Sequence, residues 1–116
     1  MKSGTDLINE SKGRIRQINA AEALKIHADG KAVFLDCRDL QEVNLGKIPG
    51  ALHISKGNLE TKIEAAIPRD ADVVIYCASG NRSALAADIM QDMGYTTVCS
   101  LAGGFRGWAD AGGEID

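Results

Sequence analysis

The stretch Val73–Leu85, Val-Val-Ile-Tyr-Cys-Ala-Ser-Gly-Asn-Arg-Ser-Ala-Leu, decides how this chain folds. Its first four residues are β-branched or aromatic and predict a buried strand that leads into Cys77. A turn of small residues follows, and a helix begins near Asn81 with Arg82 in its first turn. This order places a thiol at the carboxyl end of a strand, facing the free N–H groups of a helix N-terminus. Amide donors and the helix dipole stabilise anions, so we expect Cys77 to ionise readily.

Strands and helices alternate along the rest of the chain. Short segments with apolar or β-branched residues predict five strands, at residues 15–18, 32–36, 51–54, 72–76 and 96–100. Helical spacing and capping residues predict helices before, between and after them, at residues 6–12, 19–29, 39–45, 59–67, 81–93 and 105–111. Strands separated by helices imply an α/β fold of three layers, with a mostly parallel central sheet and helices on both faces. Ligands of such sheets bind beyond the carboxyl ends of the strands, where Cys77 lies.

Length and composition narrow the class of protein. At 116 residues the chain suits one domain, which we place at residues 14–116, with residues 1–13 as an N-terminal helical extension or loose arm. A net charge of -3 and the absence of a basic run predict no nucleic-acid partner. No apolar run approaches the roughly 20 residues that span a bilayer, and no secretion signal is visible, so we expect a cytoplasmic protein.

The three cysteines, Cys37, Cys77 and Cys99, show neither a C-x-x-C pair nor zinc-like spacing. They therefore predict neither a metal site nor a disulfide scaffold. The two histidines, His27 and His53, are expected to have packing or surface roles. Activation of Cys77 would then rest on electrostatics alone.

The residues after Cys77 distinguish a nucleophile from a structural buried thiol. Small and turn-forming residues let the backbone N–H groups curl toward the sulfur, and an arginine adds permanent positive charge. The candidate binding residues are Ala78, Ser79, Gly80, Asn81, Arg82 and Ser83. Such a nest suits a cysteine that carries extra negative charge, either as a persulfide in sulfur transfer or as a thiophosphate in phosphate-ester hydrolysis. Four residues separate Cys77 from Arg82, one fewer than in the phosphatase signature, and the shorter loop favours sulfur.

Several motifs together resemble one family. Cys77–Ser83 resembles the six-residue active-site loop of the rhodanese-like (thiosulfate sulfurtransferase) family. Leu35–Glu42 resembles its Asp-x-Arg…Glu motif, Gly46–Ala51 its Gly-His-Ile-Pro-Gly-Ala motif, and Gly94–Gly112 its C-terminal ending. His53–Glu60 is similar to an insertion in a single-domain bacterial subgroup. The motifs stand in the family's order and cover nearly the whole chain.

The resemblance implies a reaction. Cys77 would accept a sulfane sulfur from a small anionic donor such as thiosulfate and form a persulfide. It would pass that sulfur to a thiophilic acceptor, which is cyanide, a thiol or a protein thiol. Residues 78–83 would hold the outer sulfur, with no metal or organic cofactor. The alternatives are a non-catalytic module for partner binding or redox sensing, and a cysteine phosphatase or arsenate reductase on the same fold.

The remaining family positions have supporting roles in this interpretation. Asp36, Arg38 and Glu42 are expected to form a structural ion-pair network beside the strand ends. Cys37 and Cys99 are expected to be core thiols, and a resolving cysteine is the alternative for Cys37.

Two positions depart from the family pattern, and two aromatic residues have an expected structural role. Lys47 replaces the usual histidine, which we expect to affect packing, and Lys56 stands where the subgroup often has arginine. Phe105 and Trp108 should anchor the last helix on the sheet.

Overall fold

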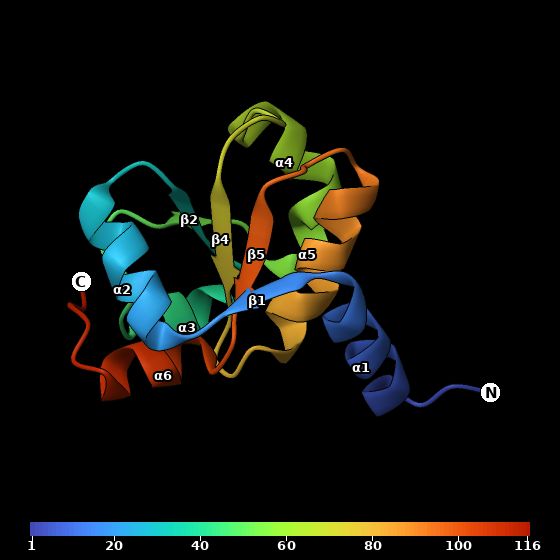
Figure 1. Cartoon of the computed structure of the whole chain (residues 1–116), viewed down its shortest axis with the longest axis horizontal. Coiled ribbons are helices and arrows are strands. Elements are labelled where there is room, and N and C mark those ends of the chain that lie inside the picture. Colours follow the sequence, from blue (N-terminus) through green and yellow to red (C-terminus); the bar gives the residue numbers. More distant parts are fainter.

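A parallel sheet of five strands lies between two layers of helices in the computed structural model, which describes residues 1–116 (Figure 1). The strand order is β1-β5-β4-β2-β3, and every neighbouring pair is parallel. The strands are β1 (Arg16–Ile18), β2 (Val33–Asp36), β3 (Leu52–His53), β4 (Val73–Tyr76) and β5 (Val98–Leu101). The helices are α1 (Gly4–Arg14), α2 (Ala20–Asp29), α3 (Leu40–Asn44), the 3-10 turn η1 (Lys56–Asn58), α4 (Leu59–Ala66), α5 (Asn81–Asp92) and α6 (Gly104–Asp110). The predicted fold class is confirmed.

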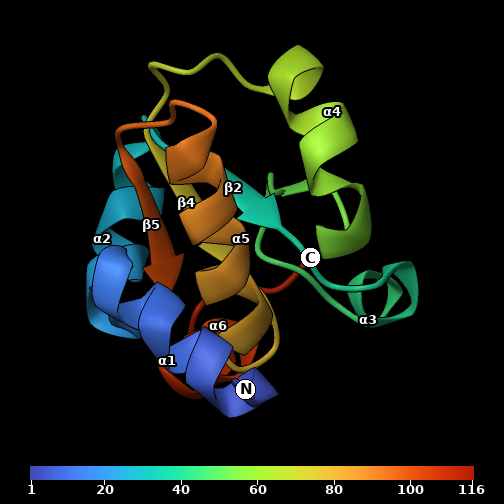
Figure 2. The same cartoon turned by 90° about the vertical axis from the view of Figure 1, so that its right-hand side faces the viewer.

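Successive side chains of the central strands point to opposite faces of the sheet, so the core consists of two clusters, one on each face. Leu35 of β2 and Ile75 of β4 belong to a cluster completed by α4 and α5. Their chain neighbours Phe34 and Val74 belong to a second cluster, which includes Trp108 of α6. Figure 2 shows α5 and α2 on opposite sides of the strands. Both faces of β4 are therefore covered, which is why its four residues are all apolar or aromatic and all buried.

β4 holds the central position of the sheet. It pairs with β2 on one side and with β5 on the other. In the β2–β4 register, Asp36 stands opposite Tyr76, so these two strands end at the same level. The next residue of each chain segment is a buried cysteine, Cys37 and Cys77 respectively. The topology thus brings the carboxyl ends of β2 and β4 together, as parallel strands require.

The N-terminal helix α1 is longer than predicted and packs against α5 (Figure 2). Ser3 caps it and forms a capping box with Asp6, so the helix begins before the predicted residue 6. The buried Ser11 donates to Asp88 of α5, and Arg14 forms an ion pair with the same carboxylate. The boundary between residues 1–13 and 14–116 stays a prediction. No helix of the chain combines the length and the apolar character needed to cross a membrane.

Candidate active site

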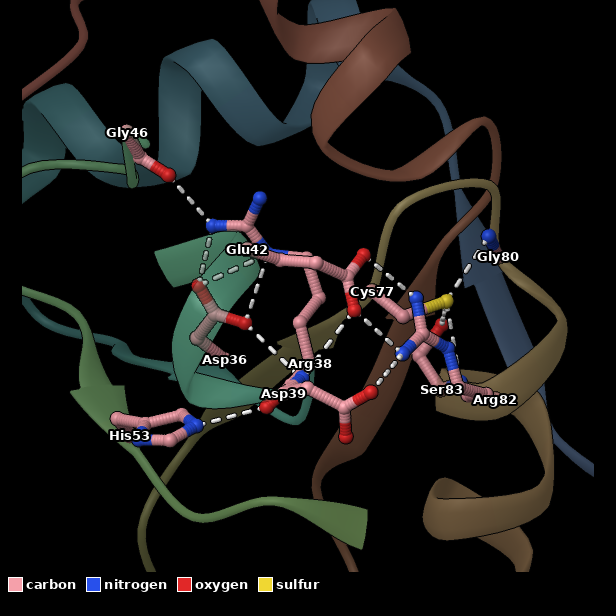
Figure 3. A network of polar contacts seen from close by, with 10 residues as sticks. All are labelled: Asp36, Arg38, Asp39, Glu42, Gly46, His53, Cys77, Gly80, Arg82 and Ser83. Carbon is pink, nitrogen blue, oxygen red and sulfur yellow. Dashed lines mark hydrogen bonds and ion pairs between the residues drawn. The ribbon is translucent and has the colours of Figure 1, made fainter. Parts of the chain in front are cut away.

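Cys77 lies directly after β4 and is only 1% exposed (Figure 3). The N–H groups of Gly80 and Ser83 donate to its sulfur at 3.1 and 3.4 Å. Gly80 reaches that position with a φ of +102°, a left-handed conformation that glycine adopts without strain. The Ser83 hydroxyl lies 3.5 Å from the same sulfur and is itself paired with Ser100 at 2.8 Å. The loop therefore surrounds the sulfur with donors.

These contacts favour the thiolate form of Cys77. The pKa of Cys77 is lowered by the neighbouring Cys37 thiol, by the Ser83 hydroxyl and by the two amides, which together outweigh burial. The pKa of Cys37 is raised, because its thiol is the donor to Cys77 and is buried beside that charge. No backbone N–H is bonded to the sulfur of Cys37. These opposite shifts in pKa favour a thiolate at Cys77 over one at Cys37.

The N-terminus of α6 holds the first half of the loop. Phe105 N–H donates to the carbonyl of Cys77 at 2.8 Å, and Arg106 N–H donates to that of Ala78 at 3.2 Å. A Cβ atom on Gly104 would lie 2.5 Å from the carbonyl oxygen of Cys77. Gly104 therefore permits the close approach that clamps the loop between β4 and α6.

The outer loop residues face solvent. Ser79 and Asn81 are exposed, and Ala78 is half-buried. Asn81 accepts a hydrogen bond at 2.9 Å from the Lys12 amine of α1. The loop thus contains a buried part that holds the sulfur and an open part that another molecule can reach.

Arg82 is paired with carboxylates across the mouth of the loop. Its guanidinium donates to both oxygens of Glu42, at 2.7 and 2.9 Å, and lies 3.9 Å from Asp39 (Figure 3). The Arg82 hydrogen bonds lower the pKa of Glu42 to about 2. The Arg82 side chain remains 36% exposed, so it is held in place and still open to solvent.

Asp36 and Arg38 form a separate, buried ion pair. Arg38 Nε and Nη2 bond to the two carboxylate oxygens of Asp36, and Nη2 also donates to the carbonyl of Gly46 at 2.6 Å. The guanidinium lies 4.4 Å from the ring centroid of Phe105, which favours a cation–π contact. Glu42 belongs to the Arg82 pair instead, so the three family positions divide between two ion pairs rather than forming one network.

Both histidines and Lys47 bond to backbone carbonyls rather than to the Cys77 sulfur. His53 bonds to the carbonyl of Arg38 at 2.7 Å, and His27 bonds to that of Pro49 at 2.8 Å. The Lys47 amine donates to the carbonyl of Ala51 at 3.3 Å, inside its own turn. Lys56 donates its backbone N–H to the carbonyl of Cys37 at 3.1 Å.

Three residues of the site were not anticipated. Ser100 forms a hydrogen bond with the Ser83 hydroxyl, and Asp39 lies near the Arg82 guanidinium. Gly104 lacks the Cβ atom that would prevent α6 from packing against the loop. Ser100 lies near the end of β5, the strand beside β4, so the strand-end rule could have found it. Asp39 and Gly104 gave no such signal, because their roles depend on how α3 and α6 pack.

The family model "Rhodanese-like domain" matches residues 19–111. The chain belongs to this family. A relative from Bacillus subtilis (strain 168), named "Putative sulfur carrier protein YrkF", is 30% identical over 93% of this chain. The chain spans 58% of the length of that relative. These matches support sulfur transfer at the level of the family.

Solved structures share the fold of this chain. The human single-domain sulfurtransferase TSTD1 has a TM-score of 0.74 and 27% identity, covering 81% of this chain and 95% of its own. The Rhodopseudomonas palustris protein RPA3614 has a TM-score of 0.91 and 36% identity, covering 100% of this chain and 96% of its own. That protein is described as of unknown function and a "Possible Tyrosine Phosphatase". The phosphatase alternative therefore needs a direct test in this chain.

Proposed function

We propose that this protein is a sulfurtransferase in which Cys77 carries the sulfur as a persulfide. The observation that carries the proposal is the set of donors aimed at the Cys77 sulfur from Gly80 and Ser83. They stabilise a thiolate before reaction, and the same curled backbone offers N–H groups to an anionic sulfur one bond further out. No histidine is bonded to this sulfur, so the nucleophile is activated by electrostatics.

The proposed reaction has two steps. The Cys77 thiolate attacks the outer sulfur of a donor such as thiosulfate, the sulfur–sulfur bond of the donor breaks, and sulfite leaves with the bonding electrons. The product is Cys77–S–S⁻. An acceptor, either cyanide or a thiolate of a small molecule or protein, then attacks the outer sulfur and releases the Cys77 thiolate. The open side of the loop, at Ser79 and Asn81, is where such an acceptor enters.

Phosphate transfer is the rival for the same nucleophile. The four-residue spacing between Cys77 and Arg82 leaves a shorter loop than a tetrahedral oxyanion needs. The two Arg82 guanidinium nitrogens also donate to the two carboxylate oxygens of Glu42. In a phosphatase, the same pair of donors would bind the phosphate of the substrate. Both observations favour the smaller, singly charged outer sulfur.

Intact mass distinguishes the candidates. We expect wild-type protein incubated with thiosulfate to gain about 32 Da, the mass of one sulfur atom, and Cys77→Ser to gain none. Hydrolysis of an aryl phosphate without a mass gain would favour the phosphatase. If the protein shows neither sulfur uptake nor phosphate hydrolysis, the result favours a non-catalytic module. Cys99→Ala is the matched control, because Cys99 is also buried but lies in the cluster on the other face of the sheet.

Arg82 is proposed to attract the anionic donor. We expect Arg82→Ala to slow thiosulfate uptake by about tenfold at low ionic strength, and the difference to shrink as salt is added. Glu42→Gln should have the opposite effect on uptake, since it releases Arg82 from its carboxylate partner. The matched control is Arg69→Ala, which removes an equal charge from the exposed pair with Glu64. Equal uptake rates for Arg82→Ala and wild type at all ionic strengths would contradict a role in donor binding.

A further inference from the structure

Cys37 lies beside the nucleophile. The two cysteines follow the opposed residues Asp36 and Tyr76 of neighbouring parallel strands, and Cys37 N–H donates to the carbonyl of Tyr76 at 3.0 Å. Both cysteines belong to the same core cluster as Leu35 and Ile75, so their side chains leave the sheet on the same face. Adjacent strands are about 4.8 Å apart. That spacing lies within the range of Cα separations, about 4.4–6.8 Å, that a disulfide bridges.

Cys37 also has access to an atom that no molecule in solution reaches easily. Cys77 and Cys37 are each 1% exposed. Under the proposed function the loop holds the outer sulfur beside the exposed Ser79 and Asn81, so an external thiol meets that atom first. The inner sulfur, Sγ of Cys77, faces Cys37 within the core. An external thiol and Cys37 therefore attack different sulfur atoms of the persulfide, and they approach from different sides.

We infer that Cys37 is a resolving thiol that discharges the Cys77 persulfide as sulfide. This inference rests on the proposed sulfurtransferase function. The sulfur of Cys37 attacks Sγ of Cys77, a bond forms between the two cysteine sulfurs, and the bond from Sγ to the outer sulfur breaks. The outer sulfur takes the bonding electrons and the thiol proton of Cys37 and leaves as HS⁻. The two cysteines are oxidised to a disulfide and the sulfane sulfur is reduced, so no other oxidant is needed.

The distribution of charge allows the attack by Cys37 only after the persulfide has formed on Cys77. In the free protein, the thiolate of Cys77 raises the pKa of Cys37 and keeps its proton in place. In the persulfide the negative charge moves to the outer sulfur, held by the loop, and Sγ becomes uncharged and electrophilic. Cys37 then faces a sulfur that it can attack. A dithiol reductant that opens the disulfide returns both cysteines, and one turnover converts a sulfane sulfur and a dithiol into sulfide and a disulfide.

Single-turnover loading without oxygen tests the inference. Wild-type protein is charged with thiosulfate, freed of donor by gel filtration, and followed by intact mass and by sulfide release. We expect the adduct of about 32 Da to convert to a species about 2 Da lighter than reduced protein, with about one equivalent of sulfide. Peptide mapping should link Cys37 to Cys77. Cys37→Ala and the closer isostere Cys37→Ser should keep the adduct at least about tenfold longer, and Cys99→Ala should behave as wild type.

The outcomes separate the two claims. A wild-type adduct that persists without sulfide release, or one that decays equally fast in the Cys37 variants, overturns the resolving role and leaves the sulfurtransferase proposal intact. If neither the wild type nor the Cys37 variants gain mass, the proposed function fails and the inference fails with it. Adduct formation in the Cys37 variants also shows that they fold.

Discussion

Replacing Arg38 by methionine is expected to lower the free energy of unfolding by about 3–5 kcal/mol. Asp36 is fully buried and Arg38 is 4% exposed, so neither charge has access to water in the folded protein. Methionine fills much of the same space, but it leaves the carboxylate of Asp36 without its ionic partner and the carbonyl of Gly46 without its donor. Urea unfolding at neutral pH measures the change.

Two further variants separate charge from packing. Arg14→Met breaks the ion pair with Asp88, in which the arginine is 59% exposed and screened by water, so it should destabilise the protein much less than Arg38→Met does. Arg38→Lys retains the charge but loses the planar fork that bonds both Asp36 oxygens, so it should lie between wild type and Arg38→Met. An Arg38→Met protein that unfolds at the wild-type urea midpoint would show that the buried pair is not needed for stability.

The sheet and the position of the nucleophile could be predicted from the sequence because they follow from local patterns. Each predicted strand is a short segment with apolar or β-branched residues between turn or capping residues, and strand–helix alternation favours parallel pairing. Cys77 directly follows the predicted strand 72–76, so the sequence places it at a strand end. The approach of the amides of Gly80 and Ser83 to its sulfur follows from the same short segment, since all three lie within seven residues of the chain.

The partners of the site depend on register and packing, which local patterns do not encode. Glu42 is 40 residues from Arg82 in the chain, and the prediction paired it with Arg38, its near neighbour in sequence. Cys37 was expected to be an ordinary core thiol, because its contact with Cys77 requires the strand register of β2 and β4. Its thiol nevertheless lowers the pKa of the nucleophile.

Cys77 is expected to react as a thiolate well below neutral pH. An unperturbed thiol, with a pKa of about 8.5, is less than about 1% ionised at about pH 6. The donors around Cys77 lower its pKa, so its thiolate persists as the pH falls, until the pH drops below that lowered value. The alkylation rate of Cys77 should therefore change little between about pH 6 and 9. Ultraviolet absorbance of the thiolate gives the same titration independently, since burial raises the pKa of Cys99 to about 11 and keeps that cysteine protonated over most of this range.

Removing one donor should move the titration toward higher pH, because each hydrogen bond to the sulfur favours its charged form. Ser83→Ala removes the hydroxyl while the amides of Gly80 and Ser83 remain, so the reaction at about pH 6 should slow moderately. Cys37→Ala removes the strongest donor and should slow it more. Cys99→Ala should leave the profile unchanged. A wild-type rate that rises about tenfold per pH unit up to about pH 8 would mean that Cys77 is an ordinary thiol, and electrostatic activation by the loop would then be ruled out.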